Sequence, residues 1–160
     1  MKFRCEREIL AEALATAGRA ATSRSGTLPV LSGVRLDVKD GDLTVTGTDL
    51  ELTIRLSVHV HSDQNGSAVV PARLVADIVK ALPAGAVEVS IADDEMSISA
   101  GRSQFSVRPL SLSDYPAQVE PGGEPVTLAS AEVGNALRQV VRAASTDDAR
   151  AVLTGVLIAS

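Results

Sequence analysis

A nine-residue stretch near the start of the chain recurs close to its end. Residues 28–36 read LPVLSGVRL and residues 150–158 read RAVLTGVLI, at an offset of 122 positions. The segments upstream of the two copies share the spacing of their Leu, Val and Ala residues at an offset of 123. A fixed internal period is the signature of a repeated structural unit. We therefore expect one complete unit followed by the beginning of a second.

A finer repeat lies within the first unit. Residues 34–56, moved by 53 positions, align without a gap on residues 87–109, so that the apolar residues at every second position coincide. This period of two indicates strands, and the Asp40-Gly41 turn, matched by Asp93-Asp94, indicates hairpins. The nested repeat predicts an α+β fold in which a unit of a helix plus an antiparallel sheet is used twice.

Three segments have apolar residues at helical spacing instead. They run from about Glu6 to Ala21, from Pro71 to the residue before Pro83, and from about Ser130 to Ala144. Proline suits the first turn of a helix, and serine is a good N-cap residue. The first two helices each belong to one copy of the finer repeat, and the third opens the second unit.

A linker is expected at residues 111–124, which are rich in Pro and Gly. We therefore assign residues 1–120 to a first domain and residues 121–160 to the beginning of a second. The second segment would hold one helix and one strand. A stub of this size cannot bury a core of its own.

Composition narrows the functions that this chain can have. Aromatic residues make up 2% of it, so it lacks the ring faces on which carbohydrate sites and base-stacking surfaces depend. The net charge of −5 argues against a nucleic-acid binder that is basic throughout, although basic residues gathered on one face would still attract phosphates. Cys5 is the only cysteine, and no apolar segment reaches the length of a membrane span. These features favour a cytoplasmic protein without a membrane partner.

Clusters of carboxylates offer an alternative from the enzyme class. Asp93-Asp94-Glu95 and Asp147-Asp148 have the residue types of a cation site, and Thr48-Asp49 with Glu51 those of an acid–base pair. Turn formation explains these clusters better, because Asp93-Asp94 replaces Asp40-Gly41 in the repeat.

Two histidines offer a metal site as a further alternative. His59 and His61 alternate along a predicted strand and would share one face of it. Two histidines without a third ligand are more often exposed to solvent. We expect no bound metal and no other cofactor.

Several short motifs follow one another in a fixed order along the whole chain. They are Met1-Lys2-Phe3 with Glu6-Arg7-Glu8, Leu28-Pro29-Val30-Leu31, Gly47-Thr48-Asp49-Leu50-Glu51, Val70-Pro71-Ala72-Arg73, Ser99-Ala100-Gly101-Arg102-Ser103 with Phe105-Ser106, and Leu153-Thr154-Gly155. In this order the motifs resemble those of one family, the bacterial sliding clamps, which are the beta subunits of DNA polymerase III. Any one motif alone would be weak, and their succession makes the resemblance specific.

The resemblance implies a ring. Members of this family carry three similar domains, and two chains close head to tail around duplex DNA, with helices lining the hole and sheets outside. A clamp catalyses no reaction; it holds the replicative polymerase on DNA while the ring slides. The implied partners are duplex DNA of any sequence, a second copy of the chain, and the polymerase alpha subunit and clamp loader, which bind through linear peptides. Residues 1–160 would be the N-terminal domain and the beginning of the central one, with the C-terminal domain absent.

The resemblance also suggests which residues contact DNA. Sliding requires weak, sequence-independent contacts to phosphates, and the family makes them from the inward helices and nearby loops. Arg19 and Arg142 occupy equivalent positions in the longer repeat, and Arg138 lies one turn before Arg142. The family's contacts carry over best to Arg73. The predicted DNA-binding residues are Arg19, Arg24, Arg73, Lys80, Arg138 and Arg142.

Two kinds of protein contact are implied as well. In the family the first domain docks on the third domain of the partner subunit, through the second helix and the strand after the Gly-Arg-Ser motif. The peptide pocket lies between the second and third domains, and Leu153 alone maps to it. The predicted subunit-interface residues are Leu74, Ile78, Arg102, Gln104, Phe105 and Val107, although Ile78 and Phe105 could instead be ordinary core residues.

The competing interpretation is a non-catalytic interaction module. Exposed sheet edges can recruit partners by adding a strand. This interpretation differs from the clamp in one respect that can be tested: it predicts no association with DNA in any assembly state.

Overall fold

The structure is a computed structural model that describes residues 1–21, 28–92, 94–117, 122 and 127–158. It divides into two compact units, Met1–Gln118 and Val119–Ser160. Each unit is described by itself below.

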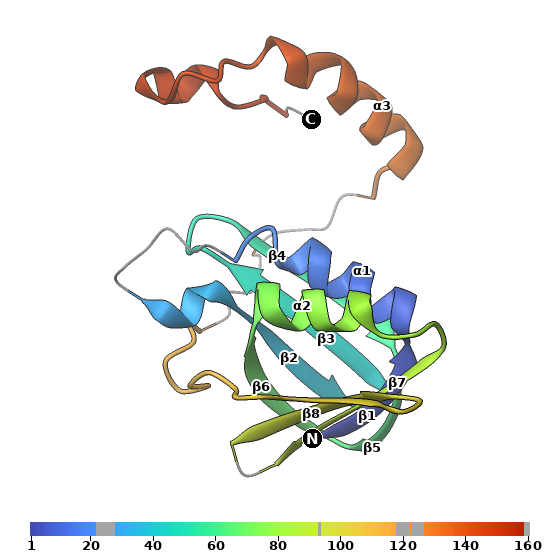
Figure 1. Cartoon of the computed structure of the whole chain (residues 1–160). Coiled ribbons are helices and arrows are strands. Elements are labelled where there is room, and N and C mark those ends of the chain that lie inside the picture. The colour runs from blue at the N-terminus through green and yellow to red at the C-terminus, as the bar shows by residue number, and fades with distance from the viewer. Residues whose placement is uncertain (22–27, 93, 118–121, 123–126, 159–160) are drawn as a thin grey trace. The chain divides into compact units, whose positions relative to one another are not determined.

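The described part of the first unit contains two α-helices, one 3-10 helix and two antiparallel sheets (Figure 1). One sheet has the strand order β5-β1-β7-β8-β9 and the other the order β4-β3-β2-β6. This arrangement confirms the α+β class. The elements in chain order are β1 Lys2–Glu6, α1 Arg7–Ala17, the 3-10 helix η1 Pro29–Ser32, β2 Gly33–Lys39, β3 Asp42–Thr48, β4 Thr53–His59, β5 His61–Gln64, β6 Gly66–Pro71, α2 Ala72–Ala81, β7 Ala86–Ala92, β8 Glu95–Ala100 and β9 Ser103–Val107.

The first unit consists of two similar halves, and these halves exchange a strand. Each half begins with a strand that leads directly into its helix, β1 into α1 and β6 into α2. β1 pairs with β7 of the second half, whereas β6 pairs with β2 of the first. The orders β1-β7-β8-β9 and β6-β2-β3-β4 are therefore equivalent, and β5 is added at one edge. Neither half can unfold alone without breaking a sheet of the other.

The gapless alignment of the two halves is wrong in the third strand of each. β2 and β3 lie 53 positions before β7 and β8, as predicted. However, Val45 faces Leu56 in one sheet, whereas its counterpart Ile98 faces Phe105 in the other. Leu56 thus corresponds to Phe105, an offset of 49 positions. The cause is a longer turn between β3 and β4.

Asp49 closes that longer turn. Its Oδ1 accepts hydrogen bonds from the backbone N–H groups of Leu52, at 2.7 Å, and Glu51, at 3.0 Å. These bonds stabilise the carboxylate, the one from Leu52 most, and they hold the pKa of Asp49 below its usual range. A carboxylate held in its ionised form accepts a proton poorly, and the residue acts as a turn former, as the sequence indicated.

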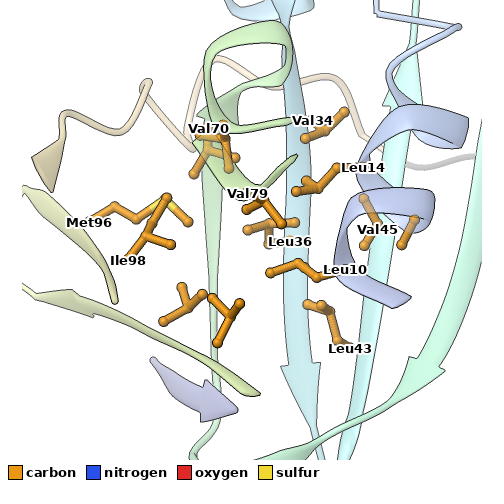
Figure 2. Close-up of a cluster of buried hydrophobic side chains, with 14 of the residues drawn as sticks. Leu10, Leu14, Val34, Leu36, Leu43, Val45, Val70, Val79, Met96 and Ile98 are labelled. Carbon is orange, nitrogen blue, oxygen red and sulfur yellow. The ribbon is translucent and has the colours of Figure 1, made fainter. Parts of the chain in front are cut away.

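The core lies between the two sheets and the helices that cover them (Figure 2). Leu10 and Leu14 of α1 and Val79 of α2 point into it, together with Leu36 of β2 and Ile98 of β8. Each of these side chains is at most 1% exposed. Because the inward face of each helix packs on the sheets, its opposite face is left on the surface.

A smaller apolar cluster covers the other side of β6. It consists of Val30, Leu31, Val69 and Tyr115, with Leu110 packed against it. The backbone N–H of Leu110 donates to the carbonyl of Val69 at 2.8 Å, and the Tyr115 hydroxyl donates to the carbonyl of Thr46 at 3.0 Å. The chain that follows β9 is therefore fixed on the sheet before it leaves the first unit.

The second unit holds α3 Ser130–Val140 and two 3-10 helices, η2 Val141–Ala143 and η3 Asp148–Leu153. η3 overlaps the position at which the longer repeat would place a copy of η1. The expected strand after it does not form, since residues 154–158 contain no strand. None of the described residues of this unit whose exposure is given is buried. Val133 and Leu137 are half-buried, whereas their counterparts Leu10 and Leu14 are core residues of the first unit.

A candidate nucleic-acid interface

The two helices of the first unit lie side by side (Figure 1). Arg7 at the start of α1 donates from its Nη1 to the carbonyl of Lys80 near the end of α2, at 3.3 Å. The helices are therefore antiparallel. Arg7, which has no predicted role, thus joins the start of α1 to the C-terminal end of α2, where the free carbonyl groups attract cations.

A groove of about 390 Å³ runs between these helices. Small residues line most of it, so a ligand could approach the helix backbones closely. The charged residues among its lining are Arg73, Asp77 and Lys80, all from α2. The remaining lining residues are Leu14, Ala15, Gly18, Ala21, Ser32, Ala72 and Ala76.

The groove brings together two of the predicted DNA-binding residues. Arg73 and Lys80 are two helical turns apart on α2, and both are exposed. The Arg73 Nε lies 4.0 Å from Asp77 Oδ2, and the Arg73 side chain is 97% exposed. Asp77 was missed by the sequence analysis, although its place four residues after Arg73 is a visible signal.

The remaining predicted DNA-binding residues are Arg19 in the first unit, Arg138 and Arg142 in the second, and Arg24. Arg19 is exposed just after α1 and does not line the groove. Arg138 on α3 and Arg142 in η2 are exposed in the second unit, where Arg138 donates to Asn135 Oδ1. Arg24 lies outside the described residues.

Residues predicted for a subunit interface lie on α2 and β9. Leu74 is 50% exposed, and Ile78, one turn later, is half-buried against the core. Phe105 is 40% exposed and faces Ile98 across the strand pair, so it is not an ordinary core residue. Among the described strands β9 pairs with β8 alone, which leaves it at a sheet edge.

Val107 is the least accessible of the residues assigned to the subunit interface. Its side chain is 5% exposed and belongs to the core, opposite the buried Met96. A partner could reach only its backbone. Arg102, in the turn before β9, and Gln104 are exposed, and Gln104 Nε2 donates to Ser97 Oγ at 3.3 Å. Leu153, assigned to the peptide pocket, is 54% exposed at the end of η3.

The alternative sites gain no support from the part of the chain that the structure describes. No three residues of the His, Cys, Asp and Glu types are grouped there as metal ligands would be. His59 Nδ1 lies 3.2 Å from Asp42 Oδ1, and His61 Nε2 lies 3.8 Å from Asp63 Oδ1, so each histidine has its own carboxylate neighbour.

Burial raises the pKa of the Cys5 thiol to about 11, which leaves little thiolate at neutral pH. None of the described helices is long and apolar enough to cross a membrane.

Comparison with known proteins points to one family. Residues 1–119 match the family described as DNA polymerase III beta subunit, N-terminal domain. The chain is 37% identical over 158 residues to the beta sliding clamp of Streptomyces coelicolor and 30% identical over 167 residues to that of Bacillus subtilis. These alignments cover 99% and 98% of this chain but 42% and 44% of the relatives. The chain thus spans less than half the length of these two relatives.

Solved structures give the same result for the fold. The DNA polymerase III beta subunit of Pseudomonas aeruginosa is similar at a TM-score of 0.86 and 31% identity, covering 97% of this chain and 43% of that one. The sliding clamp of Bacillus subtilis is similar at a TM-score of 0.87 and 29% identity, with the same coverage. The fold is that of the sliding clamps.

Proposed function

This chain belongs to the family of DNA polymerase III beta subunits, the bacterial sliding clamps, and we propose that it forms part of a ring that slides on duplex DNA. In a polypeptide of the relatives' length, residues 1–120 would be the first domain and residues 121–160 the beginning of the second. The ring would be a non-catalytic processivity factor in the bacterial cytoplasm. The observation that carries this proposal is the exposed face of α1 and α2, with Arg73 and Lys80 above small side chains.

The chemistry of this face suits contact with phosphates. Exposed arginine and lysine side chains bind phosphates through long-range attraction and need no particular base sequence. The small residues between the helices would let a DNA backbone approach without a clash. Few phosphate contacts give weak, salt-dependent binding, which a sliding ring requires. Arg19, Arg24, Arg138 and Arg142 would add further contacts once the ring is assembled.

Ring closure would use α2 and β9, the edge strand of the sheet with the order β5-β1-β7-β8-β9. Leu74, Ile78 and Phe105 offer apolar surface, and the outer backbone groups of β9 are available for pairing. Arg102 and Gln104 would lie at the polar rim of this contact. We assign the docking partner as a second copy of the chain.

Polymerase and clamp-loader peptides would bind outside the first unit. One solved clamp from Pseudomonas aeruginosa, 31% identical to this chain, is bound to griselimycin. Leu153 is the residue of this chain that we assign to a peptide pocket, where linear peptides of the polymerase alpha subunit and the loader would dock.

The DNA-binding face can be tested on this chain by NMR titration with a short duplex at low ionic strength. We expect weak binding that shifts amide signals of α1 and α2. Lys80→Gln and Arg73→Gln should each weaken binding about two- to five-fold and lower the salt slope by roughly one, since each removes one phosphate contact.

Lys39→Gln is the matched control, because Lys39 is exposed at the end of β2 and does not line the groove. It should change the affinity less than Lys80→Gln does. Signal changes confined to the sheets, or an equal loss in the control, would contradict this DNA face. Complete absence of binding would favour the interaction module.

A further inference from the structure

Among the described residues that line the groove between α1 and α2, Asp77 is the only acidic one. It follows Arg73 by four residues and precedes Lys80 by three, so it shares a helix face with both. Its Oδ2 is 4.0 Å from Arg73 Nε, and its side chain is 66% exposed. A negative charge therefore lies between the two cations of a face that we assign to phosphate binding.

The stability of α2 does not account for this acid. The helix dipole favours a carboxylate in the first turn of a helix, and Asp77 lies beyond the first turn of α2. An acid that follows its basic partner by four residues is the less favourable order for an ion pair on a helix, and the favourable order toward Lys80, three residues later, adds little at an exposed site. An exposed pair at this distance contributes little to folding. Aspartate is moreover among the poorer helix formers.

We propose that Asp77 limits the affinity of this face for DNA by competing with phosphate for the Arg73 guanidinium. This inference rests on the proposed function of the face. A phosphate that binds Arg73 competes with the Asp77 carboxylate and, once bound, remains near that negative charge. Both effects shorten the time that a phosphate stays bound. In a sliding ring such a contact breaks readily as the DNA moves, so Asp77 sets the balance between holding DNA and sliding along it.

Asp77→Asn tests this directly, because it removes the charge and nearly preserves the shape of an exposed side chain. The affinity of the chain for a short duplex at low ionic strength should rise about three-fold, as expected for one unit charge several ångströms from a phosphate in water. The gain should shrink at higher salt. Line broadening of the Arg73 Nε–Hε signal on titration would report the contact itself.

The matched control is Asp63→Asn. Asp63 is also exposed and also lies near a cation, with its Oδ2 3.7 Å from Lys2 Nζ, but it belongs to β5 and not to the groove. This variant changes the net charge equally and should leave the affinity almost unchanged. A gain as large as that of Asp77→Asn would mean that net charge alone acts, and the proposal would fail.

A double-variant cycle separates the role of Arg73 from that of the charge. In an Arg73→Gln background, Asp77→Asn should give clearly less gain than in the original chain. An undiminished gain would overturn competition for Arg73. If DNA shifts the α1 and α2 signals and Asp77→Asn has no effect, this inference fails while the proposed function survives. If DNA does not perturb these helices at all, the DNA face itself is wrong.

Discussion

A chain with Gly47→Ala is expected to lose much of the stability of its first unit. Gly47 lies in β3, where the end of α1 crosses the sheet. A Cβ atom at this position would be 2.0 Å from the Ala17 carbonyl oxygen and 2.8 Å from its carbon. Both are backbone atoms of a packed helix end and cannot rotate away. Either α1 shifts off the sheet or the sheet deforms, and both would disturb the core around Leu14.

We expect a loss of about 3 kcal/mol or more in the free energy of unfolding, at the upper end for overpacked sites. The melting temperature should fall by on the order of 10 °C or more for a unit of this size. Circular dichroism during heating, with urea unfolding in parallel, measures both. Gly155→Ala is the control, because nothing lies within 4 Å of a Cβ built there. If both variants melt with the original chain, the close approach of α1 to β3 is not present in solution.

The second large effect is expected for Val107→Asp. Val107 is 5% exposed in the core at the end of β9. Asp at this site would place a carboxylate among apolar side chains without a partner, which costs several kcal/mol or forces the group to take up a proton. We expect at least about 3 kcal/mol of destabilisation at neutral pH. Part of it should be recovered at acid pH, where the carboxyl becomes neutral.

Ser106→Asp is the matched control for this variant. It introduces the same charge on the same strand, at an exposed neighbour whose side chain points the other way. Its unfolding free energy should stay within about 0.5 kcal/mol of the original. Equal stability of the two variants in urea would show that the Val107 side chain is exposed and not part of the core.

The spacing of apolar residues and the presence of turn-forming residues predicted most elements of the first unit. Helical spacing located α1 and α2, and alternation located β2, β3, β7 and β8, because one face of each element is buried. β5 was not predicted as a separate strand, since its sequence HSDQ has no apolar alternation. The prediction that His59 and His61 share one strand was therefore wrong: His59 ends β4 in one sheet, and His61 begins β5 in the other. The exchange of β1 and β6 could not be inferred either, because tertiary packing decides which strand lies beside a given strand. The sequence did not reveal that β4 and β9 correspond at an offset of 49 positions and not 53, because alternating strands align equally well at several even offsets.

The candidate site was partly predictable for similar reasons. Arg73 and Lys80 are seven residues apart, so helical geometry alone places them on one face. Phe105 and Val107 have the same parity and face the same side of β9, and the sequence does not distinguish them. They differ in exposure because only the part of the strand beside Val107 is covered on that side. The cover depends on the packing of other elements.

We propose that this chain encircles DNA as part of a ring, and retention on closed DNA tests that claim. A chimera carrying residues 1–119 of this chain in place of the matching part of the Streptomyces coelicolor clamp would be loaded onto a nicked circular plasmid. The plasmid would then be cut at one site, and protein bound to DNA measured by gel filtration, with the parent clamp as control. We predict that the chimera stays on the circle and leaves the cut plasmid. Equal retention on both forms, or failure to stay on a circle that holds the parent, would contradict the claim.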